Sequence, residues 1–86
     1  MDLKQLREKI DEVDKKLLAC FNERMRLAKL IAQEKQKTAT PIENCKREAQ
    51  VLEVVGQFAE REIAQYAKRL YAEIFKLSKQ YQQEIE

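Results

Sequence analysis

Two cations, Arg24 and Lys35, lie within an apolar helical stripe and are the first candidates for chemistry. Arg24 follows Leu17 by seven residues and precedes Ile31 by seven, so the three share one face of a helix. Lys35 lies eleven residues beyond Arg24, close to three helical turns, on nearly the same face. A buried guanidinium requires a compensating anion. The pattern therefore predicts an anion-binding site inside a helical protein.

Further polar residues interrupt the apolar pattern in the second half of the chain. They are Arg47 and Glu48 near the start of a second predicted helix, and Ser78 and Gln82 one turn apart on a third. Several cations facing one acid and one neutral amide suit a small ligand that carries more than one carboxylate and a hydroxyl. The reason is that arginine pairs with carboxylates through two hydrogen bonds, and glutamate accepts from a hydroxyl.

The elements that must position these groups begin with one very long helix, whose stripe is too long for 86 residues to enclose. No Gly or Pro interrupts residues 3–35, a helix of roughly 50 Å, whereas a compact monomer would have a radius of gyration of about 12 Å. Part of this helix must be covered by another chain, which predicts an intertwined helical oligomer. The stripe comprises Leu3, Leu6, Ile10, Val13, Leu17, Cys20, Phe21, Leu27, Ala28 and Ile31.

Arg7 gives a geometric reason for expecting the site to involve two chains. It stands seventeen residues before Arg24 on the same predicted helix, which is about 25 Å along the axis. Both arginines therefore cannot contact one small molecule from a single chain. If Arg7 serves the site, the partner subunit must deliver it.

Capping signals divide the chain into three helices within a single all-α domain, residues 1–86. The first is predicted from Leu3 to Lys37, with Asp2 as N-cap, and the stretch 38–41 ends it. The second has two competing start signals, a capping box with proline at residues 40–43 and an N-cap at Asn44; we favour Asn44. It is expected to end at Gly56, a natural C-terminal cap, and the third helix to span residues 62–84.

Composition excludes several classes of function. The net charge is only +2, and charges alternate in sign along the outer faces, so nucleic acid is a poor partner. Neither a secretory h-region nor an apolar run of membrane-spanning length occurs, which predicts a cytoplasmic protein without a membrane partner. With no His, and with Cys20 and Cys45 far apart, we expect no metal site, and the cysteines suit buried or half-buried thiols in a reducing compartment.

At this point the chain resembles the all-helical chorismate mutase family. The fragments that carry the resemblance are weak singly, but their collinear order and spacing are fairly specific and cover nearly the whole chain. They are Leu6-Arg7-Glu8-Lys9-Ile10-Asp11, Asp14-Lys15-Lys16-Leu17-Leu18, Asn22-Glu23-Arg24, Leu27-Ala28, Pro41-Ile42 followed by Asn44, Arg47-Glu48, and Ser78 with Gln82.

The resemblance implies an interlocked homodimer with two identical pockets, each completed by Arg7 from the other chain. It implies the pericyclic Claisen rearrangement of chorismate to prephenate, on the route to phenylalanine and tyrosine. That reaction needs no nucleophile, metal, cofactor or proton transfer, so a chain without histidine is suited to it.

The resemblance also implies a role for each site residue. Arg7 of the partner and Arg24 would hold the two carboxylates, with Ser78 giving a further polar contact to one of them. Lys35 and Gln82 would donate to the ether oxygen, where negative charge grows in the transition state. Glu48 would accept the ring hydroxyl, with Arg47 steadying that corner. The family commonly has Asp where this chain has Asn44, which keeps an N-cap and removes a negative charge from the substrate-binding set.

Two other functions remain open on the residues alone. An isochorismate pyruvate lyase of the same fold would have a similar cationic pocket, although Glu48 directly after Arg47 fits the mutase pattern better. A non-enzymatic helical dimerisation module would use Arg24, Lys35 and Gln82 as polar residues that set the register. Such a module should tolerate Gln82→Leu, whereas an enzyme should lose activity.

Overall fold

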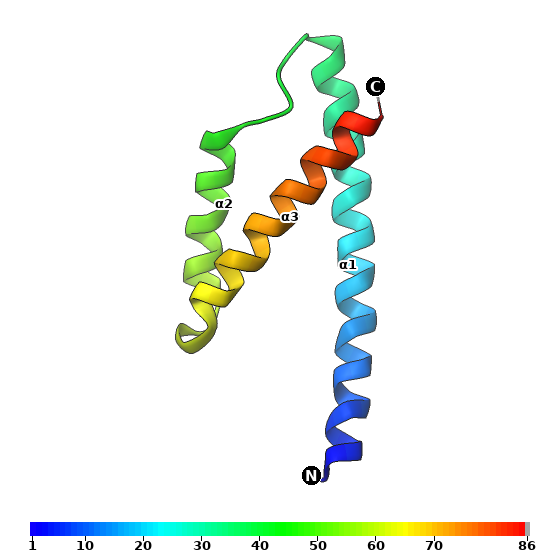
Figure 1. The fold of residues 1–86 in the computed structure, drawn as a ribbon, viewed down its shortest axis with the longest axis vertical. Coiled ribbons are helices and arrows are strands. Elements are labelled where there is room, and N and C mark those ends of the chain that lie inside the picture. Colours follow the sequence, from blue (N-terminus) through cyan, green and yellow to red (C-terminus); the bar gives the residue numbers. More distant parts are fainter. Residues whose placement is uncertain (86) are drawn as a thin grey trace.

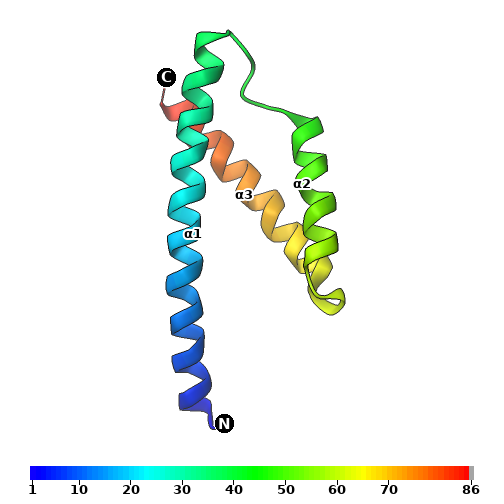
Figure 2. The same ribbon diagram turned by 180° about the vertical axis from the view of Figure 1, so that it is seen from behind.

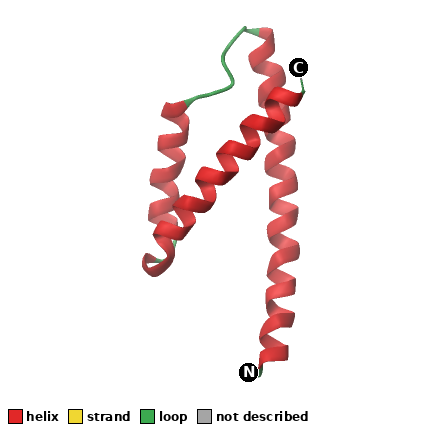
Figure 3. Cartoon of the chain, in the orientation of Figure 1, coloured by secondary structure: helices red, strands yellow, loops and turns green. Residues whose placement is uncertain are grey.

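Three α-helices make up most of the chain in a computed structural model, which describes residues 1–85 (Figure 1). They are α1 (Leu3–Lys37), α2 (Cys45–Phe58) and α3 (Ala64–Glu84), and a 3₁₀ turn, Arg61–Ile63, leads into α3. The described range contains no strand (Figure 3). The predicted all-α class with three helices, one of them long, is therefore confirmed.

Both ends of α1 follow from local side-chain and backbone chemistry. At the start, the Asp2 carboxylate accepts from the backbone N–H of Gln5 at 2.8 Å, and the Gln5 side chain accepts from the backbone N–H of Asp2 at 3.1 Å. This reciprocal pair satisfies two N–H groups that a helix start otherwise leaves without partners. At the end, Ala39 takes a left-handed backbone with φ of 53°, and the N–H of Thr40 donates to the carbonyl of Lys35. The predicted bounds of α1 are confirmed.

The second helix begins where the favoured signal predicts and ends later than expected. The Asn44 side chain accepts from the backbone N–H of Arg47 at 3.0 Å, which caps α2. Gly56 does not end the helix: it lacks a left-handed backbone, and α2 continues to Phe58, so the prediction of a glycine cap is wrong. The helix ends instead because Ala59 turns to an extended conformation. The third helix also begins slightly later than predicted, because residues 61–63 form the 3₁₀ turn.

The position of Gly56 inside α2 leads to a stability prediction. A Cβ added there would meet only the end of the flexible Lys68 side chain, 2.9 Å from its Cε and 3.3 Å from its Nζ. We therefore expect Gly56→Ala to stabilise the protein by about 0.5–1 kcal/mol, because glycine in a helix interior costs that much relative to alanine. Urea denaturation of the two proteins tests it. A loss of stability would show that Lys68 cannot move aside.

The third helix, α3, packs between the other two and holds them together. In both views α3 runs obliquely, with its first turns beside the end of α2 and its last turns beside the C-terminal half of α1 (Figures 1 and 2). It packs against each of them. The side chains most shielded from solvent lie along these contacts: Ala28, Ala32, Val55, Phe75, Ser78 and Gln82. Two of the six are polar, so polar groups line the interior of this small fold.

The N-terminal half of α1 stands clear of the rest of the chain (Figures 1 and 2). Every residue from 1 to 20 is exposed, and the stripe residues from Leu3 to Leu17 keep 43–61% of their surface accessible. The radius of gyration is 15.9 Å, against about 12 Å for a compact chain of this length. Cys20 and Cys45 are exposed too, so their predicted burial is wrong for the single chain. No helix within residues 1–85 is long and apolar enough to cross a membrane.

Candidate active site

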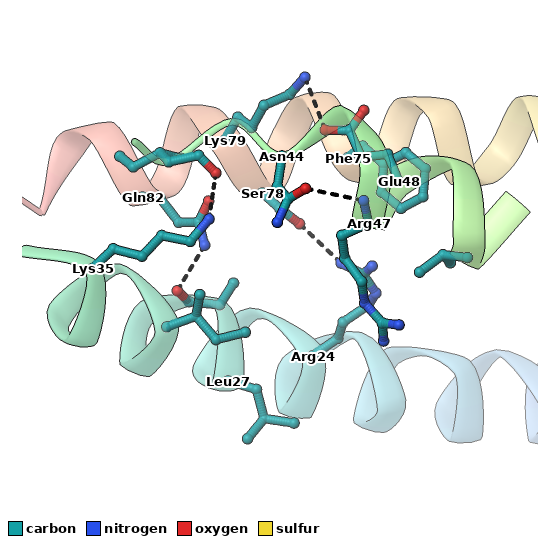
Figure 4. A pocket seen from close by; sticks show the side chains of 14 residues that line it. Arg24, Leu27, Lys35, Asn44, Arg47, Glu48, Phe75, Ser78, Lys79 and Gln82 are labelled. Carbon is teal, nitrogen blue, oxygen red and sulfur yellow. Dashed lines mark hydrogen bonds and ion pairs between the residues drawn. The ribbon is translucent and has the colours of Figure 1, made fainter. Parts of the chain in front are cut away.

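A pocket of about 280 Å³ lies where the C-terminal half of α1, the start of α2 and the end of α3 come together (Figure 4). Such a volume suits a small molecule. All the predicted site residues except Arg7 line it: Arg24, Lys35, Asn44, Arg47, Glu48, Ser78 and Gln82. Three helices thus bring together residues that are up to 58 positions apart in sequence, from Arg24 to Gln82.

Arg24 is held by α3 in a way that leaves donors free for a ligand. One guanidinium nitrogen, Nη1, donates to the Ser78 hydroxyl at 3.1 Å. The guanidinium carbon lies 5.9 Å from the centre of the Tyr71 ring and 5.7 Å from that of Phe75, distances typical of cation–π contacts. A guanidinium has five N–H donors, so this fixed group retains several for a carboxylate.

Lys35 and Gln82 each donate to a backbone carbonyl. The Lys35 ammonium donates to the carbonyl of Ile42 at 2.7 Å, which ties the segment after α1 to the pocket. The buried Gln82 amide donates through Nε2 to the carbonyl of Ala28 at 2.9 Å, a bond that links α3 to α1. An ammonium has three N–H donors and an amide two, so each group retains N–H capacity for a ligand.

The α2 side of the pocket carries both charge signs. Asn44 uses its side-chain oxygen as the N-cap, so its amide nitrogen is the part left for a ligand. Arg47 is exposed, and Glu48, partly buried, lies in the first turn of α2. A carboxylate in a first turn is favoured by the helix dipole.

Sequence reasoning missed Lys79, which also lines the pocket. Its ammonium lies 3.2 Å from Glu48 Oε2 (Figure 4) and 3.3 Å from Glu43 Oε1. The hydrogen bond to Glu48 is the main reason that the pKa of Lys79 is raised above 10.5, with Glu43 adding to it against the effect of desolvation. Phe75 was missed as well. A signal was present, since Phe75, Ser78, Lys79 and Gln82 follow the i, i+3, i+4, i+7 spacing of one helix face.

Arg7 is the one predicted site residue that the chain does not bring to the pocket. It is exposed in the N-terminal half of α1, about 25 Å along the helix from Arg24. No bend brings the two closer, because residues 3–37 form one uninterrupted helix (Figure 1). Any role for Arg7 in the site therefore requires a second chain.

Fold and pocket together define an all-helical protein with a cation-rich pocket. The chain belongs to the chorismate mutase type II family, whose model matches residues 6–83. The resemblance drawn from the sequence is thus confirmed, and the family takes its name from an isomerase.

A curated relative agrees with this assignment. The bifunctional chorismate mutase/prephenate dehydratase of Aquifex aeolicus (strain VF5) is 41% identical over 54 residues, which cover 63% of this chain. The match covers 15% of that protein, so the chain corresponds to a small part of its length. No solved structure matches the chain.

Proposed function

We propose that this chain is a chorismate mutase, an isomerase that converts chorismate to prephenate by an intramolecular Claisen rearrangement on the route to phenylalanine and tyrosine. The observation that carries the proposal is the gathering of seven predicted site residues around one pocket in a member of this family. The proposal covers residues 1–86 as one catalytic domain without metal or cofactor. It places the enzyme in the cytoplasm, a reducing compartment compatible with its free thiols.

Substrate binding is assigned to the arginines. Chorismate carries two carboxylates, and Arg24 would bind one of them through the N–H donors that Ser78 leaves free. Arg7 of the second chain would bind the other carboxylate. Ser78 itself contacts Arg24, so it would act on the carboxylate directly or by orienting the guanidinium.

Catalysis is assigned mainly to Lys35 and Gln82. The reaction breaks the bond between the ring and the ether oxygen, and negative charge grows on that oxygen in the transition state. Fixed donors aimed at that position stabilise the transition state more than the substrate, and enclosure holds the reactive conformer. Lys35 and Gln82 are anchored by the carbonyls of Ile42 and Ala28, which supports a preorganised pair of donors.

The α2 residues would bind the ring side of the substrate. Glu48 would accept the ring hydroxyl, and Arg47 would steady that corner of the pocket. Asn44 would contribute chiefly by capping α2 and so holding Arg47 and Glu48 in place, with its amide nitrogen as a further donor.

We further propose that the protein is an intertwined homodimer. The exposed stripe on residues 3–17 of α1 supports this, because apolar area left in water on a small domain is typical of an interface. A second chain packed along this stripe would cover the apolar side chains and would carry its own Arg7 toward this pocket.

The dimer has a direct test. Sedimentation should find a dimer at micromolar concentration, and Ile10→Glu on the stripe should weaken it by about 2 kcal/mol or more, since a buried isoleucine contributes roughly 1.5–3 kcal/mol and the carboxylate adds a desolvation cost. Lys15→Glu, on the opposite side of the same helix, introduces the same residue and should leave the dimer intact. A folded wild-type monomer at micromolar concentration would contradict the proposal.

The activity is tested by incubating the purified protein with chorismate. Loss of chorismate's ultraviolet absorbance with formation of prephenate would support the mutase. Formation of salicylate and pyruvate from isochorismate, without action on chorismate, would favour the lyase instead. A protein that forms a dimer but acts on neither substrate would favour the dimerisation module.

A further inference from the structure

Lys79 connects three segments of the chain at the edge of the pocket. From α3 its ammonium reaches Glu48 in the first turn of α2 and Glu43 in the segment before α2, at 3.2 and 3.3 Å. The Lys79 and Glu48 side chains keep only 29% and 27% of their surface exposed, whereas Glu43 keeps 63%. The contact with Glu48 is therefore the better shielded of the two, and a shielded pair is screened less than an ordinary surface pair.

Glu48 is in an unusual position, because it is the only acidic residue lining the pocket within the part of the chain described. Arg24, Lys35 and Arg47 line the same pocket. A carboxylate free to turn toward one of these cations would neutralise a charge needed for an anionic ligand. Lys79 offers Glu48 a competing partner.

We propose that Lys79 is a positioning residue, whose ammonium holds the Glu48 carboxylate through Oε2 and leaves Oε1 to accept the ring hydroxyl of the substrate. This inference rests on the proposed function. No other hydrogen bond or ion pair engages the Glu48 side chain within residues 1–85, so Oε1 keeps its capacity to accept. A carboxylate has two oxygens with several lone pairs, so one oxygen can serve the protein and the other the ligand.

The charge state of Lys79 agrees with this role. Because its pKa is raised above 10.5, mainly by the hydrogen bond to Glu48, the group is an ammonium throughout the neutral range. At 3.2 Å, the contact with Glu48 is then an ion pair throughout the neutral range, and it holds the carboxylate by charge.

Replacing Lys79 tests the inference. Lys79→Met keeps most of the side-chain length and removes the charge, and it should lower kcat/KM for chorismate by about tenfold to a hundredfold, the scale of a misplaced contact group. Lys79→Arg, which can still bond Glu48, should restore most of the loss. Glu43→Gln removes only the other partner of Lys79 and should behave like wild type. Circular dichroism and sedimentation check folding, and Lys79→Gln replaces Lys79→Met if the latter unfolds.

Two comparisons separate positioning of Glu48 from simple anchoring of α2. In a Glu48→Gln background, Lys79→Met should lower kcat/KM little further, because the carboxylate that Lys79 positions has already been replaced. With a substrate analogue lacking the ring hydroxyl, wild type and Lys79→Met should react at similar rates. The inference would be overturned if the losses in kcat/KM caused by Lys79→Met and Glu48→Gln simply multiplied in the double variant. It would also be overturned if Lys79→Met lowered kcat/KM as much for the analogue as for chorismate. So would a folded, fully active Lys79→Met protein, and in that case the mutase assignment would still stand. Wild type without mutase activity would overturn both.

Discussion

Mixed and refolded together, Arg7→Ala and Arg24→Ala chains are expected to regain activity that neither has alone. Each variant by itself should lose about thirtyfold or more in kcat/KM, since truncating one side of a buried charge pair costs about 2–5 kcal/mol. In a heterodimer, one pocket has Arg24 from the first chain and Arg7 from the second, and the other pocket has neither. Random pairing in a symmetric dimer then leaves about a quarter of all pockets intact. Steady-state assays on the mixture should show about that share of wild-type activity.

A second mixture supplies the matched control. Arg24 and Lys35 line the pocket of the same chain, so mixing Arg24→Ala with Lys35→Ala leaves every heterodimer pocket with one defect, and no activity should return. Arg26→Ala changes an exposed arginine of α1 that pairs with Glu23, and it should remain active. If heterodimers of the first mixture form and stay inactive, Arg7 does not complete the site.

The reason for expecting two chains at one site is a distance that the fold cannot shorten. Arg24 is fixed against Ser78 and two aromatic rings at the α1–α3 contact, and Arg7 lies about 25 Å away on the same unbroken helix. Ile10, Val13 and Leu17, which lie between them on the apolar stripe, are exposed in the single chain. The exposed apolar stripe and Arg7, which the single chain does not bring to the pocket, thus lie on the same half of α1.

Local signals predicted the helices well because each acts within a few residues. Asp2 and Asn44 cap helices by bonds to N–H groups three residues away, and their effect needs no tertiary context. The prediction that α2 ends at Gly56 was wrong because glycine permits a left-handed turn but does not require one. With a helical backbone at Gly56, α2 continues for two more residues, to Phe58, although the Phe58 side chain is 89% exposed. The helix ends at Ala59, whose extended backbone neither helical periodicity nor the position of the glycine indicates.

Residues that line the pocket were predictable where a polar residue broke an apolar stripe. Arg24 and Gln82 stood out for that reason, and both are shielded by the contact between α1 and α3. Lys79 did not stand out, because a lysine in an amphipathic helix is ordinarily solvated. Its partners, Glu43 and Glu48, are 36 and 31 positions away, and only the fold brings them near. Pairings of this kind cannot be deduced from helical periodicity.

Gln82→Glu is expected to lower kcat by about a hundredfold or more near neutral pH and to regain activity as the pH falls. The Gln82 amide donates to the Ala28 carbonyl and retains a second N–H, which the proposed mechanism assigns to the ether oxygen. An ionised carboxylate at this position would donate to neither, and it would repel both the carbonyl oxygen and the charge growing in the transition state. Protonation makes the group a donor again. Activity should therefore rise as the pH falls through the pKa of the new carboxyl.

The measurement is a pH profile of kcat and kcat/KM for wild type and variant, and the loss should appear mainly in kcat because the missing interaction belongs to the transition state. Wild type should lack the rise toward acid, since an amide donates at every pH. Gln83→Glu adds the same charge one residue away on an exposed position of α3 and should follow wild type. Circular dichroism at each pH separates recovered chemistry from a change in folding. A folded Gln82→Glu protein whose profile runs parallel to wild type would leave Gln82 as a link between α1 and α3 and remove it from the mechanism.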